Sequence, residues 1–343
     1  SGDRNDETSR AGGPDGNGSE HSAVNCRERA SINSRLEVAV RLLRVIATWT
    51  VGAVVGIVVV LAASVGIDYA VGTKRILDVT NVEVPASAGT PAVRAYVAKP
   101  TQPGPRPIVI MIHEFYGLNA SITGKADLLA RQGYVVVAPD TFRGSTTSWI
   151  PRAIYQTLTA RPEVVNADLD AVVAWAKAQP GADPSRVAVM GFCYGGRTSL
   201  LYTLHDPSIA ATVVFYGNPE TDPQKLKAIK GPVLGIFGGA DSSIPVAQVD
   251  AFRKGLETAG VRNRVTVYDG QPHAFVVDAA GIKAGGVQEQ AWNDMLGFLK
   301  DSFEAPRAGI EAGNPEAASV PTSFTYLMAL ALEHVRDHRT HLH

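Results

Sequence analysis

The sequence predicts an α/β protein in which helices cover both faces of a mostly parallel β-sheet, preceded by one apolar N-terminal helix. Two observations support this prediction. Segments with the composition of strands alternate with helical segments from residue 78 to residue 304, and such alternation is typical of a parallel sheet. Ahead of them, residues 45–67 form a run of 23 residues without a charged side chain. The chain has 343 residues and is 45% hydrophobic, which suffices for one large domain with a sizeable core.

The N-terminal part of the chain divides into a polar tail and an apolar run. Residues 1–34 are rich in Gly, Ser, Asn, Asp and Arg, so we expect a disordered basic tail, which we extend to residue 44. As a helix, the uncharged run is ~34 Å long, and the hydrocarbon core of a bilayer is ~30 Å thick. We therefore expect residues 45–67 to form a transmembrane helix in contact with the lipid bilayer.

The charges beside this run predict its orientation. Basic residues before the run are Arg27, Arg29, Arg35, Arg41 and Arg44, and those that follow closely are Lys74 and Arg75. The positive-inside rule then predicts a single-pass membrane protein with a cytoplasmic N-terminus and an extracytoplasmic catalytic domain. The alternative is a secreted protein released by cleavage near Ala62-Ala63-Ser64, although the run is longer than the ~7 to 15 apolar residues of a secretory signal.

The folded domain is expected over residues 78–304. Strands are expected at 78–85, 93–98, 107–112, 134–138, 187–190, 211–215, 233–237 and 265–268. Helices are expected at 123–131, 165–179, 194–204, 246–259 and 288–303. Residues 107–112 are almost all apolar, as in a central strand that is buried on both faces. Ligands of such sheets bind outside the carboxyl ends of the strands.

Residues 305–343 form a C-terminal extension. Its short apolar segment, 323–335, is too brief to span a bilayer, so we expect a helix that docks on the domain, on a partner or on the membrane surface. The chain ends with His334, His338, His341 and His343. The first two could share a helical face and bind a metal, but terminal tails are usually solvated, so we predict no metal site.

Charge and cysteine content exclude several classes of protein. The formal net charge is −1 and the folded region has no basic stripe, so we expect no nucleic-acid partner. Cys26 and Cys193 lie on opposite sides of the predicted membrane helix, so no structural disulfide is expected. Cys193 should be a free thiol.

Cys193 lies in the sequence Gly191-Phe192-Cys193-Tyr194-Gly195-Gly196, between a predicted strand and a predicted helix. The pattern Gly-x-Cys-x-Gly matches the nucleophile elbow of α/β-hydrolases, with a thiol in place of the hydroxyl. Glycines on both sides permit the strained, sharp turn that presents the central side chain at the carboxyl end of a strand. Alone, the pattern also fits an inert buried cysteine.

An acid and a histidine follow two later strands. Asp241 comes after residues 233–237, and His273 comes after residues 265–268. Nucleophile, acid and histidine then occur in the chain order of the α/β-hydrolase triad. Each residue alone fits a loop role, but the order and placement of all three favour catalysis. We predict that Cys193 is the nucleophile, that His273 is its base and that Asp241 orients the imidazole.

Four motifs together resemble the dienelactone hydrolase family over residues 78–303. They are His113-Glu114-Phe115-Tyr116-Gly117-Leu118-Asn119, the Cys193 elbow, Gly239-Ala240-Asp241-Ser242-Ser243-Ile244-Pro245 and Pro272-His273-Ala274-Phe275. The resemblance implies an α/β-hydrolase fold and a hydrolase that cleaves a carboxylic ester or lactone through a cysteine thiolate and a thioester acyl-enzyme. It implies no cofactor and no metal. It also implies that Glu114 contacts the resting thiol and gates its activation, and that the backbone N–H groups of Phe115 and Tyr194 form the oxyanion hole.

Positions expected to bind substrate depart from the family. Members that act on dienelactone carry a serine directly after the catalytic histidine and an arginine four residues after it, where this chain has Ala274 and Val277. Arg143 corresponds to a second family arginine after a one-residue adjustment, and Tyr116 is a further substrate-binding candidate. Loss of an arginine removes a contact to a substrate carboxylate. We therefore expect a less charged ester, lactone or thioester as the substrate.

Two other functions fit the same residues. A thioesterase or an acyltransferase would use the same triad, and a non-catalytic, membrane-tethered binding module would keep only the fold. A broken triad would indicate the binding module, and all three members are present here. The sequence points to no particular protein partner.

Overall fold

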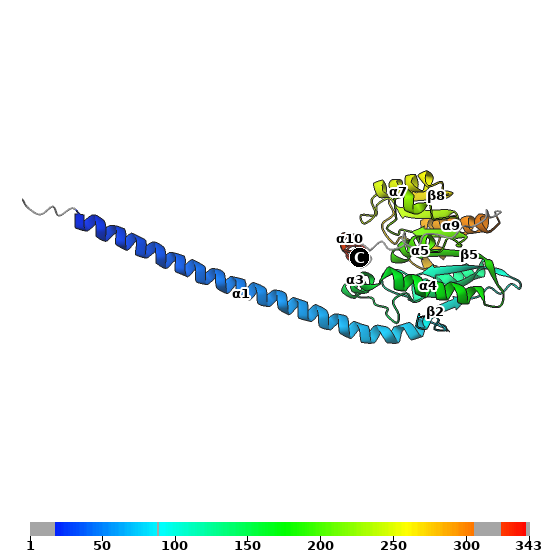
Figure 1. Ribbon diagram of the computed structural model, residues 1–343, viewed down its shortest axis with the longest axis horizontal. Coiled ribbons are helices and arrows are strands. Elements are labelled where there is room, and N and C mark those ends of the chain that lie inside the picture. The colour runs from blue at the N-terminus through cyan, green and yellow to red at the C-terminus, as the bar shows by residue number, and fades with distance from the viewer. Residues whose placement is uncertain (1–17, 88, 305–323, 341–343) are drawn as a thin grey trace, which may run out of the picture. The chain divides into compact units, whose positions relative to one another are not determined.

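The computed structural model describes residues 18–87, 89–304 and 324–340 (Figure 1). The chain divides into two units, one that ends at Ala63 and one over Ser64–His343. Helix α1, Gly18–Val79, contributes residues to both units.

The expected disordered tail differs from the structure. Residues 1–17 lie outside the described part of the chain, but from Gly18 onward the chain is helical, so the prediction of disorder is wrong for residues 18–44. No glycine or proline occurs between Ser19 and Val51, and Ala, Leu, Arg and Glu recur through this stretch. These residue types favour helix strongly enough for α1 to begin well before the apolar run.

One stretch of α1, Arg35–Ala70, is long and apolar enough to cross a membrane or, because it lies near the N-terminus, to be a signal sequence. Its side chains from Arg35 to Ala63 are all exposed. The span predicted at residues 45–67 falls inside this stretch. Its orientation in a membrane stays a prediction.

An eight-stranded sheet forms the centre of the unit Ser64–His343, with strand order β1-β2-β4-β3-β5-β6-β7-β8. The strands are β1 Val82–Val84, β2 Val93–Ala98, β3 Arg106–Ile112, β4 Val135–Pro139, β5 Ala182–Phe192, β6 Ala211–Phe215, β7 Val233–Gly238 and β8 Asn263–Tyr268. The β1–β2 and β2–β4 pairs are antiparallel, and all other neighbours are parallel. Strands β4, β6 and β7 are buried at every position, which explains their continuous apolar sequence.

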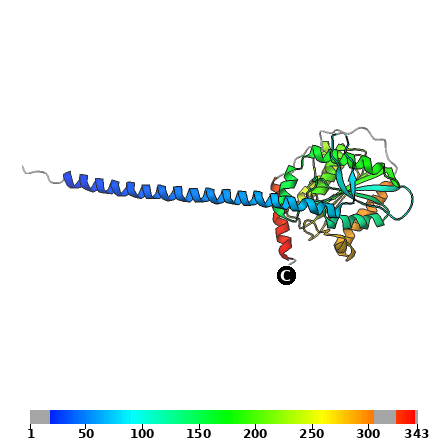
Figure 2. The same cartoon turned by 90° about the horizontal axis from the view of Figure 1, so that it is seen from below.

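Helices cover both faces of this sheet (Figures 1 and 2). Those that follow the sheet strands are α2 Ala120–Arg131, α3 Ile150–Thr159, α4 Pro162–Lys177, α5 Tyr194–His205, α6 Pro223–Leu226, α7 Val246–Thr258, α8 Ala279–Lys283 and α9 Gly286–Glu304. The crossover through α2 runs along the sheet in the opposite direction to those through α4, α5 and α7. Right-handed connections therefore place α2 on one face and α4, α5 and α7 on the other. Helix α9 packs on β6 and β7 and is linked to α2 through α8.

The predicted α/β architecture is confirmed, with small differences at element ends. The first expected strand is shortened, because α1 continues to Val79 and leaves only Val82–Val84 as β1. The strand expected at 187–190 is longer in the structure, where β5 runs over Ala182–Phe192. Helix α3 was not expected. Its N-terminal turn carries Pro151, and the Gly, Ser and Thr residues before it read as a loop.

The C-terminal apolar segment forms helix α10, Phe324–Thr340. Of the three expected docking places, the structure shows the domain, because α10 lies against α3 (Figure 1). Its residues Tyr326, Leu327 and Leu330 join the hydrophobic core. The side chains of His334 and of the later histidines lie outside the described residues. The prediction that these histidines form no metal site therefore stays a prediction.

Candidate active site

Cys193 occupies the turn between β5 and α5. Its backbone has φ 55° and ψ −114°, a conformation that L-residues rarely adopt. A Cβ atom on Gly191 would lie 2.2 Å from backbone atoms of Gly195, and one on Gly195 would lie 2.2 Å from the carbonyl oxygen of Ile112. Glycine on both sides of Cys193 is therefore what lets the turn close against β3.

Backbone hydrogen bonds hold this turn in place. The Cys193 N–H donates to the carbonyl oxygen of Phe215 at 2.9 Å, and the Cys193 carbonyl accepts from the Arg197 N–H at 3.1 Å. The thiol is free of any disulfide and only 1% exposed. A strained, buried and fixed cysteine at a helix N-terminus is the arrangement expected of a nucleophile elbow.

His273 and Asp241 form a buried pair beside this turn. His273 Nδ1 lies 2.7 Å from Asp241 Oδ2. Asp241 also accepts hydrogen bonds from the Ser243 N–H at 2.8 Å, the Ser243 hydroxyl at 2.7 Å and the Ile244 N–H at 2.9 Å. Burial works against the Asp241 carboxylate, but the hydrogen bond and the attraction from His273 outweigh it and lower its pKa below the ordinary value.

The charge of Cys193 also acts on His273, so the two side chains lie near one another. Burial disfavours the imidazolium, but Cys193 and Asp241 outweigh burial and raise the pKa of His273 well above its ordinary value. Since Nδ1 bonds to Asp241, Nε2 is the nitrogen left for the sulfur. The structure thus places Asp241, His273 and Cys193 near one another at the carboxyl edge of the sheet. That they act as a catalytic triad stays a prediction.

Glu114 is half-buried in the loop after β3. Its carboxylate interacts by charge with Tyr116 and Tyr216, and Cys193 interacts with the same two tyrosines. Glu114 and Cys193 therefore share neighbours, an arrangement compatible with the predicted role of Glu114. That role stays a prediction.

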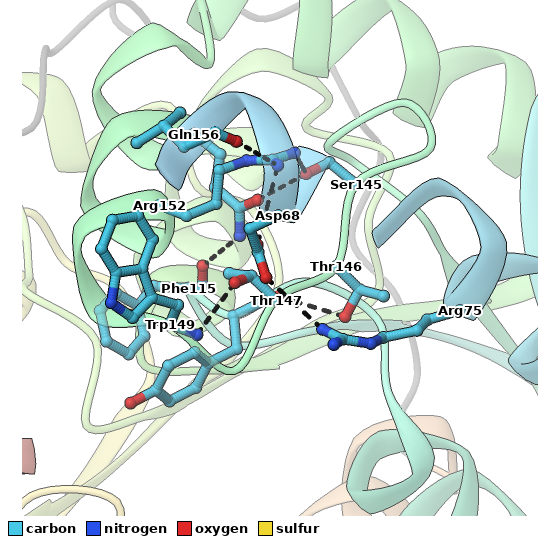
Figure 3. Close-up of polar contacts among 11 residues, drawn as sticks. Asp68, Arg75, Phe115, Ser145, Thr146, Thr147, Trp149, Arg152 and Gln156 are labelled. Carbon is cyan, nitrogen blue, oxygen red and sulfur yellow. Dashed lines mark hydrogen bonds and ion pairs between the residues drawn. The ribbon is translucent and has the colours of Figure 1, made fainter. Parts of the chain in front are cut away.

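The two residues expected to form the oxyanion hole lie on the elements that flank Cys193. Tyr194 is the first residue of α5, so its N–H has no acceptor within the helix. Phe115 is fully buried in the loop after β3. Its carbonyl oxygen accepts a 2.7 Å hydrogen bond from Gln156 Nε2, which fixes this loop to α3 (Figure 3).

A chain of polar side chains continues from Gln156 to the end of α1 (Figure 3). Ser145 Oγ donates to Gln156 Oε1 at 2.7 Å, and the Arg152 guanidinium donates to Ser145 Oγ. Arg152 is 1% exposed and pairs with Asp68 at 3.7 Å. The last turns of α1 therefore reach the Phe115 loop through three side chains, which sequence patterns did not indicate.

The expected substrate-binding residues do not all lie together. Tyr116 is half-buried and interacts with Glu114 and Cys193. Ala274, directly after His273, has a left-handed backbone with φ 56°, and Val277 is 54% exposed.

Arg143 is already paired with the carboxylate of Asp168. Its guanidinium donates two hydrogen bonds to Asp168, at 2.8 and 2.9 Å, and this pairing raises the pKa of Arg143. It lines a cavity of about 290 Å³ together with Phe142, Arg152 and Tyr155. A substrate carboxylate at Arg143 would have to compete with a bidentate pair already formed, so its predicted role stays a prediction.

Two buried titratable residues were not assigned from the sequence. His113 Nε2 accepts from the Thr141 N–H at 3.2 Å, and burial lowers the pKa of His113 to about 4. Lys125 is fully buried, with its ammonium 4.3 Å from the centre of the Phe192 ring. Burial lowers the pKa of Lys125, although the negative charge of Glu114 acts to raise it. The position of Lys125 on the apolar face of α2 was the sequence signal for its burial.

Asp241, His273 and Glu333 bring atoms of metal-ligand type within 4.8 Å of one another. Two of these side chains already make other bonds. His273 Nδ1 bonds to Asp241, and Glu333 Oε1 accepts from two backbone N–H groups. The donor set therefore fits an acid–histidine pair better than a metal centre.

Comparison with known proteins shows the family of this chain. Residues 93–303 match the model of the dienelactone hydrolase family. The chain belongs to the dienelactone hydrolase family. A family relative from Methylorubrum extorquens, named carboxymethylenebutenolidase, is 35% identical over 211 residues, which are 57% of this chain and 72% of the relative. A relative of the same name from Escherichia coli strain K12 is 33% identical over 221 residues, covering 60% of this chain and 81% of the relative.

Solved structures of the family have the same fold. A crystal structure described as a dienelactone hydrolase from Klebsiella pneumoniae is 30% identical, covers 64% of this chain and 96% of its own, and has a TM-score of 0.57. A dienelactone hydrolase-like phosphotriesterase from metagenomic libraries has a TM-score of 0.57 at 22% identity and covers 65% of this chain and 98% of its own, a likeness of fold alone. Family membership supports a hydrolase of a lactone or an ester. Helices α1 and α10 both lie outside the matched residues.

Proposed function

We propose that this protein hydrolyses a carboxylic ester or lactone with Cys193 as the nucleophile. The observation that carries the proposal is the 2.7 Å hydrogen bond between His273 Nδ1 and Asp241 Oδ2, made beside a buried thiol whose backbone is held at φ 55°. A thiol needs a base to form the thiolate, and the base needs a partner to fix its tautomer. His273 and Asp241 have the contacts to fill these two roles.

Acylation begins with transfer of the Cys193 proton to His273. The thiolate attacks the carbonyl carbon of the substrate, and the carbonyl electron pair moves to oxygen. In the proposal, the N–H groups of Phe115 and Tyr194 bind this oxyanion, and removal of one such donor typically costs about 10²-fold or more in rate. Collapse breaks the bond to the alcohol oxygen, which takes the proton from His273, and leaves a thioester on Cys193.

Deacylation uses water. His273 takes a proton from the water molecule as its oxygen attacks the thioester carbonyl, and the new tetrahedral intermediate collapses to release the acid and the Cys193 thiolate. The imidazolium that forms in both half-reactions is stabilised by Asp241, because burial keeps the pair away from water and strengthens their attraction. Glu114 is proposed to assist the first proton transfer.

The proposed substrate is less charged than dienelactone. Ala274 and Val277 offer apolar side chains where the resemblance implies a serine and an arginine, and the guanidinium of Arg143 is already paired with Asp168. A substrate carboxylate that bound Arg143 would have to displace Asp168 from the guanidinium. Neutral acyl groups should therefore be preferred.

The experiment is a panel of aryl esters, lactones and thioesters, assayed with the full chain purified in detergent. We expect ester or lactone turnover that falls on the order of 10³-fold or more in Cys193→Ala. The matched control is Cys26→Ala, which should leave turnover unchanged. Equal turnover by Cys193→Ala would remove the nucleophile assignment.

The same panel addresses the alternatives. A thioester preference of more than about tenfold over the matching oxygen ester would favour a thioesterase. Faster product formation with an added alcohol or amine, without more free acid, would favour an acyltransferase. No turnover of any member, together with an unreactive Cys193, would favour the binding module.

The proposal places the catalytic domain outside the cytoplasm, anchored through residues 45–67 in a lipid bilayer. Its support is the apolar stretch Arg35–Ala70 and the arginines that precede it. Protease added to intact cells should digest the domain, whereas protection would reverse the orientation. A mature chain that begins near Ser64 would instead indicate secretion after cleavage.

A further inference from the structure

Helix α10 supplies a carboxylate to the two loops that carry Asp241 and His273. Glu333 Oε1 accepts a hydrogen bond of 3.2 Å from the His273 N–H and another of 3.2 Å from the Ser242 N–H. The first N–H belongs to the loop after β8 and the second to the loop after β7. One oxygen atom of Glu333 therefore ties both loops together, next to the pair that they form.

The carboxylate of Glu333 is buried against the acid–histidine pair. The residue is only 6% exposed, and its Oε2 has no hydrogen-bond partner among the described residues. Burial and the charge of Asp241 raise the pKa of Glu333, while His273 and the two backbone N–H groups oppose this rise. A helix that merely docked would not need this buried carboxylate, because an apolar side chain would avoid the cost of desolvation.

Tyr326 lies on the same face of α10, seven residues before Glu333, with Leu330 between them. Its side chain is buried, and the charges of Cys193, Asp241 and Arg197 act on its hydroxyl. The hydroxyl has no hydrogen-bond partner among the described residues. Two polar side chains of one helix are thus aimed at the proposed triad.

We propose that α10 forms one wall of the active site, in which Glu333 is a positioning residue for the Asp241–His273 pair and Tyr326 limits the room for the acyl group at Cys193. This inference rests on the proposed function and deepens it. Because α10 lies outside residues 93–303, the wall is added to the family domain by the C-terminal extension of this chain. The C-terminal extension then contributes to substrate specificity.

The test of Glu333 compares Glu333→Gln and Glu333→Leu in the full chain, with the exposed neighbour substitution Leu332→Ala as the matched control. Gln keeps an oxygen that can accept both N–H groups, whereas Leu removes it. We expect kcat for an aryl ester to fall about tenfold or more in Glu333→Leu with little change in KM, to stay within about threefold in Glu333→Gln, and to be unchanged in Leu332→Ala.

A second readout does not depend on turnover. The groups that face His273 come from four places in the fold. They are Cys193 from the turn before α5, Asp241 from the loop after β7, Tyr216 directly after β6, with its ring centre 5.2 Å away, and Glu333 from α10. A negative charge stabilises the imidazolium, so its removal in Glu333→Gln should lower the pKa of His273. The acid limb of iodoacetamide alkylation of Cys193 should then move to lower pH, and thermal melting should show that the variant is folded.

The test of Tyr326 uses acyl chains of increasing length. We expect Tyr326→Ala to raise the ratio of kcat/KM for a hexanoyl ester over an acetyl ester by about tenfold, whereas Tyr326→Phe and Leu332→Ala keep the wild-type ratio. Unchanged ratios in Tyr326→Ala, with unchanged alkylation profiles in both Glu333 variants, would overturn the proposal. If the wild-type chain hydrolyses no ester but Glu333→Gln shifts the alkylation profile, the role of Glu333 stands and the proposed function fails.

Discussion

Gln156 on α3 donates a 2.7 Å hydrogen bond to the carbonyl oxygen of Phe115, so a helix that sequence patterns did not indicate holds the loop after β3 (Figure 3). The N–H of Phe115 is one of the two proposed oxyanion donors. Positions of such donors matter at the level of tenths of an ångström, because they must meet the oxygen of the transition state. Contacts behind this loop should therefore influence catalysis without touching the substrate.

Substitution of Gln156 by Met tests this influence. Met has a similar length but cannot donate to Phe115, so we predict a fall of about tenfold in kcat with a small change in KM. The matched control is Gln179→Met. It removes a 3.3 Å hydrogen bond from the side-chain amide of Gln179 to the carbonyl oxygen of Trp175 at the end of α4. Equal losses in both variants would show that the effect is one of general stability.

The ion pair between Asp68 and Arg152 predicts that the end of α1 stabilises the catalytic domain. Asp68→Asn leaves a buried guanidinium without its charged partner, so the free energy of unfolding should fall by about 2 kcal/mol. Arg75 pairs with Asp68 at the same distance, 3.7 Å, but is 45% exposed, so Arg75→Met should cost less than about 0.5 kcal/mol. Urea unfolding of both variants and of Arg152→Met measures these differences. Equal costs for Asp68→Asn and Arg75→Met would contradict the prediction.

Burial of His113 predicts a stability that falls in mild acid. In the unfolded chain the His113 imidazole binds a proton below about pH 6.5. In the folded chain burial lowers the pKa of His113 to about 4, so the imidazole stays neutral down to that pH. The contribution of His113 to the free energy of unfolding is therefore complete above pH 6.5 and falls by about 3 kcal/mol as the pH drops to 4.

His113→Gln isolates this effect. Burial raises the pKa of Asp140 to about 6, so this group works in the opposite direction over part of the same range and remains in both proteins. Urea unfolding between pH 7 and pH 4 should therefore show a smaller loss in His113→Gln than in the wild type. Parallel curves for the two proteins would mean that His113 does not carry the pH dependence.

The backbone of Cys193 predicts a difference between two inactive variants. At φ 55°, alanine keeps the strain of a side chain in a left-handed conformation, whereas glycine relieves it. Cys193→Gly should therefore unfold with a free energy about 1 kcal/mol higher than Cys193→Ala, in spite of the flexibility of glycine. Thermal and urea unfolding of the pair provide the measurement, and a more stable Cys193→Ala would refute the strained elbow.

Local sequence patterns predicted the sheet and the elbow because their causes are local. Residues 211–215 form β6 as predicted, because a short apolar run between turn residues has few alternatives to a buried strand. Gly191 and Gly195 were recognised because a sharp turn excludes side chains whatever surrounds it. Residues 18–44, which precede the apolar run, were mistaken for disorder because composition outweighed the helix-forming residues within them.

By itself, the sequence determined the order of the strands and of the longer helices around them other than α3, the glycine turn at Cys193, and the succession of thiol, carboxylate and imidazole at the ends of three strands. Only the tertiary structure decided which side chains support them. Gln156 meets Phe115 across 41 positions of the chain, and Glu333 meets Ser242 across 91. Contacts of this range depend on how α3 and α10 pack at the edge of the sheet, and no periodicity or motif near either residue encodes that packing.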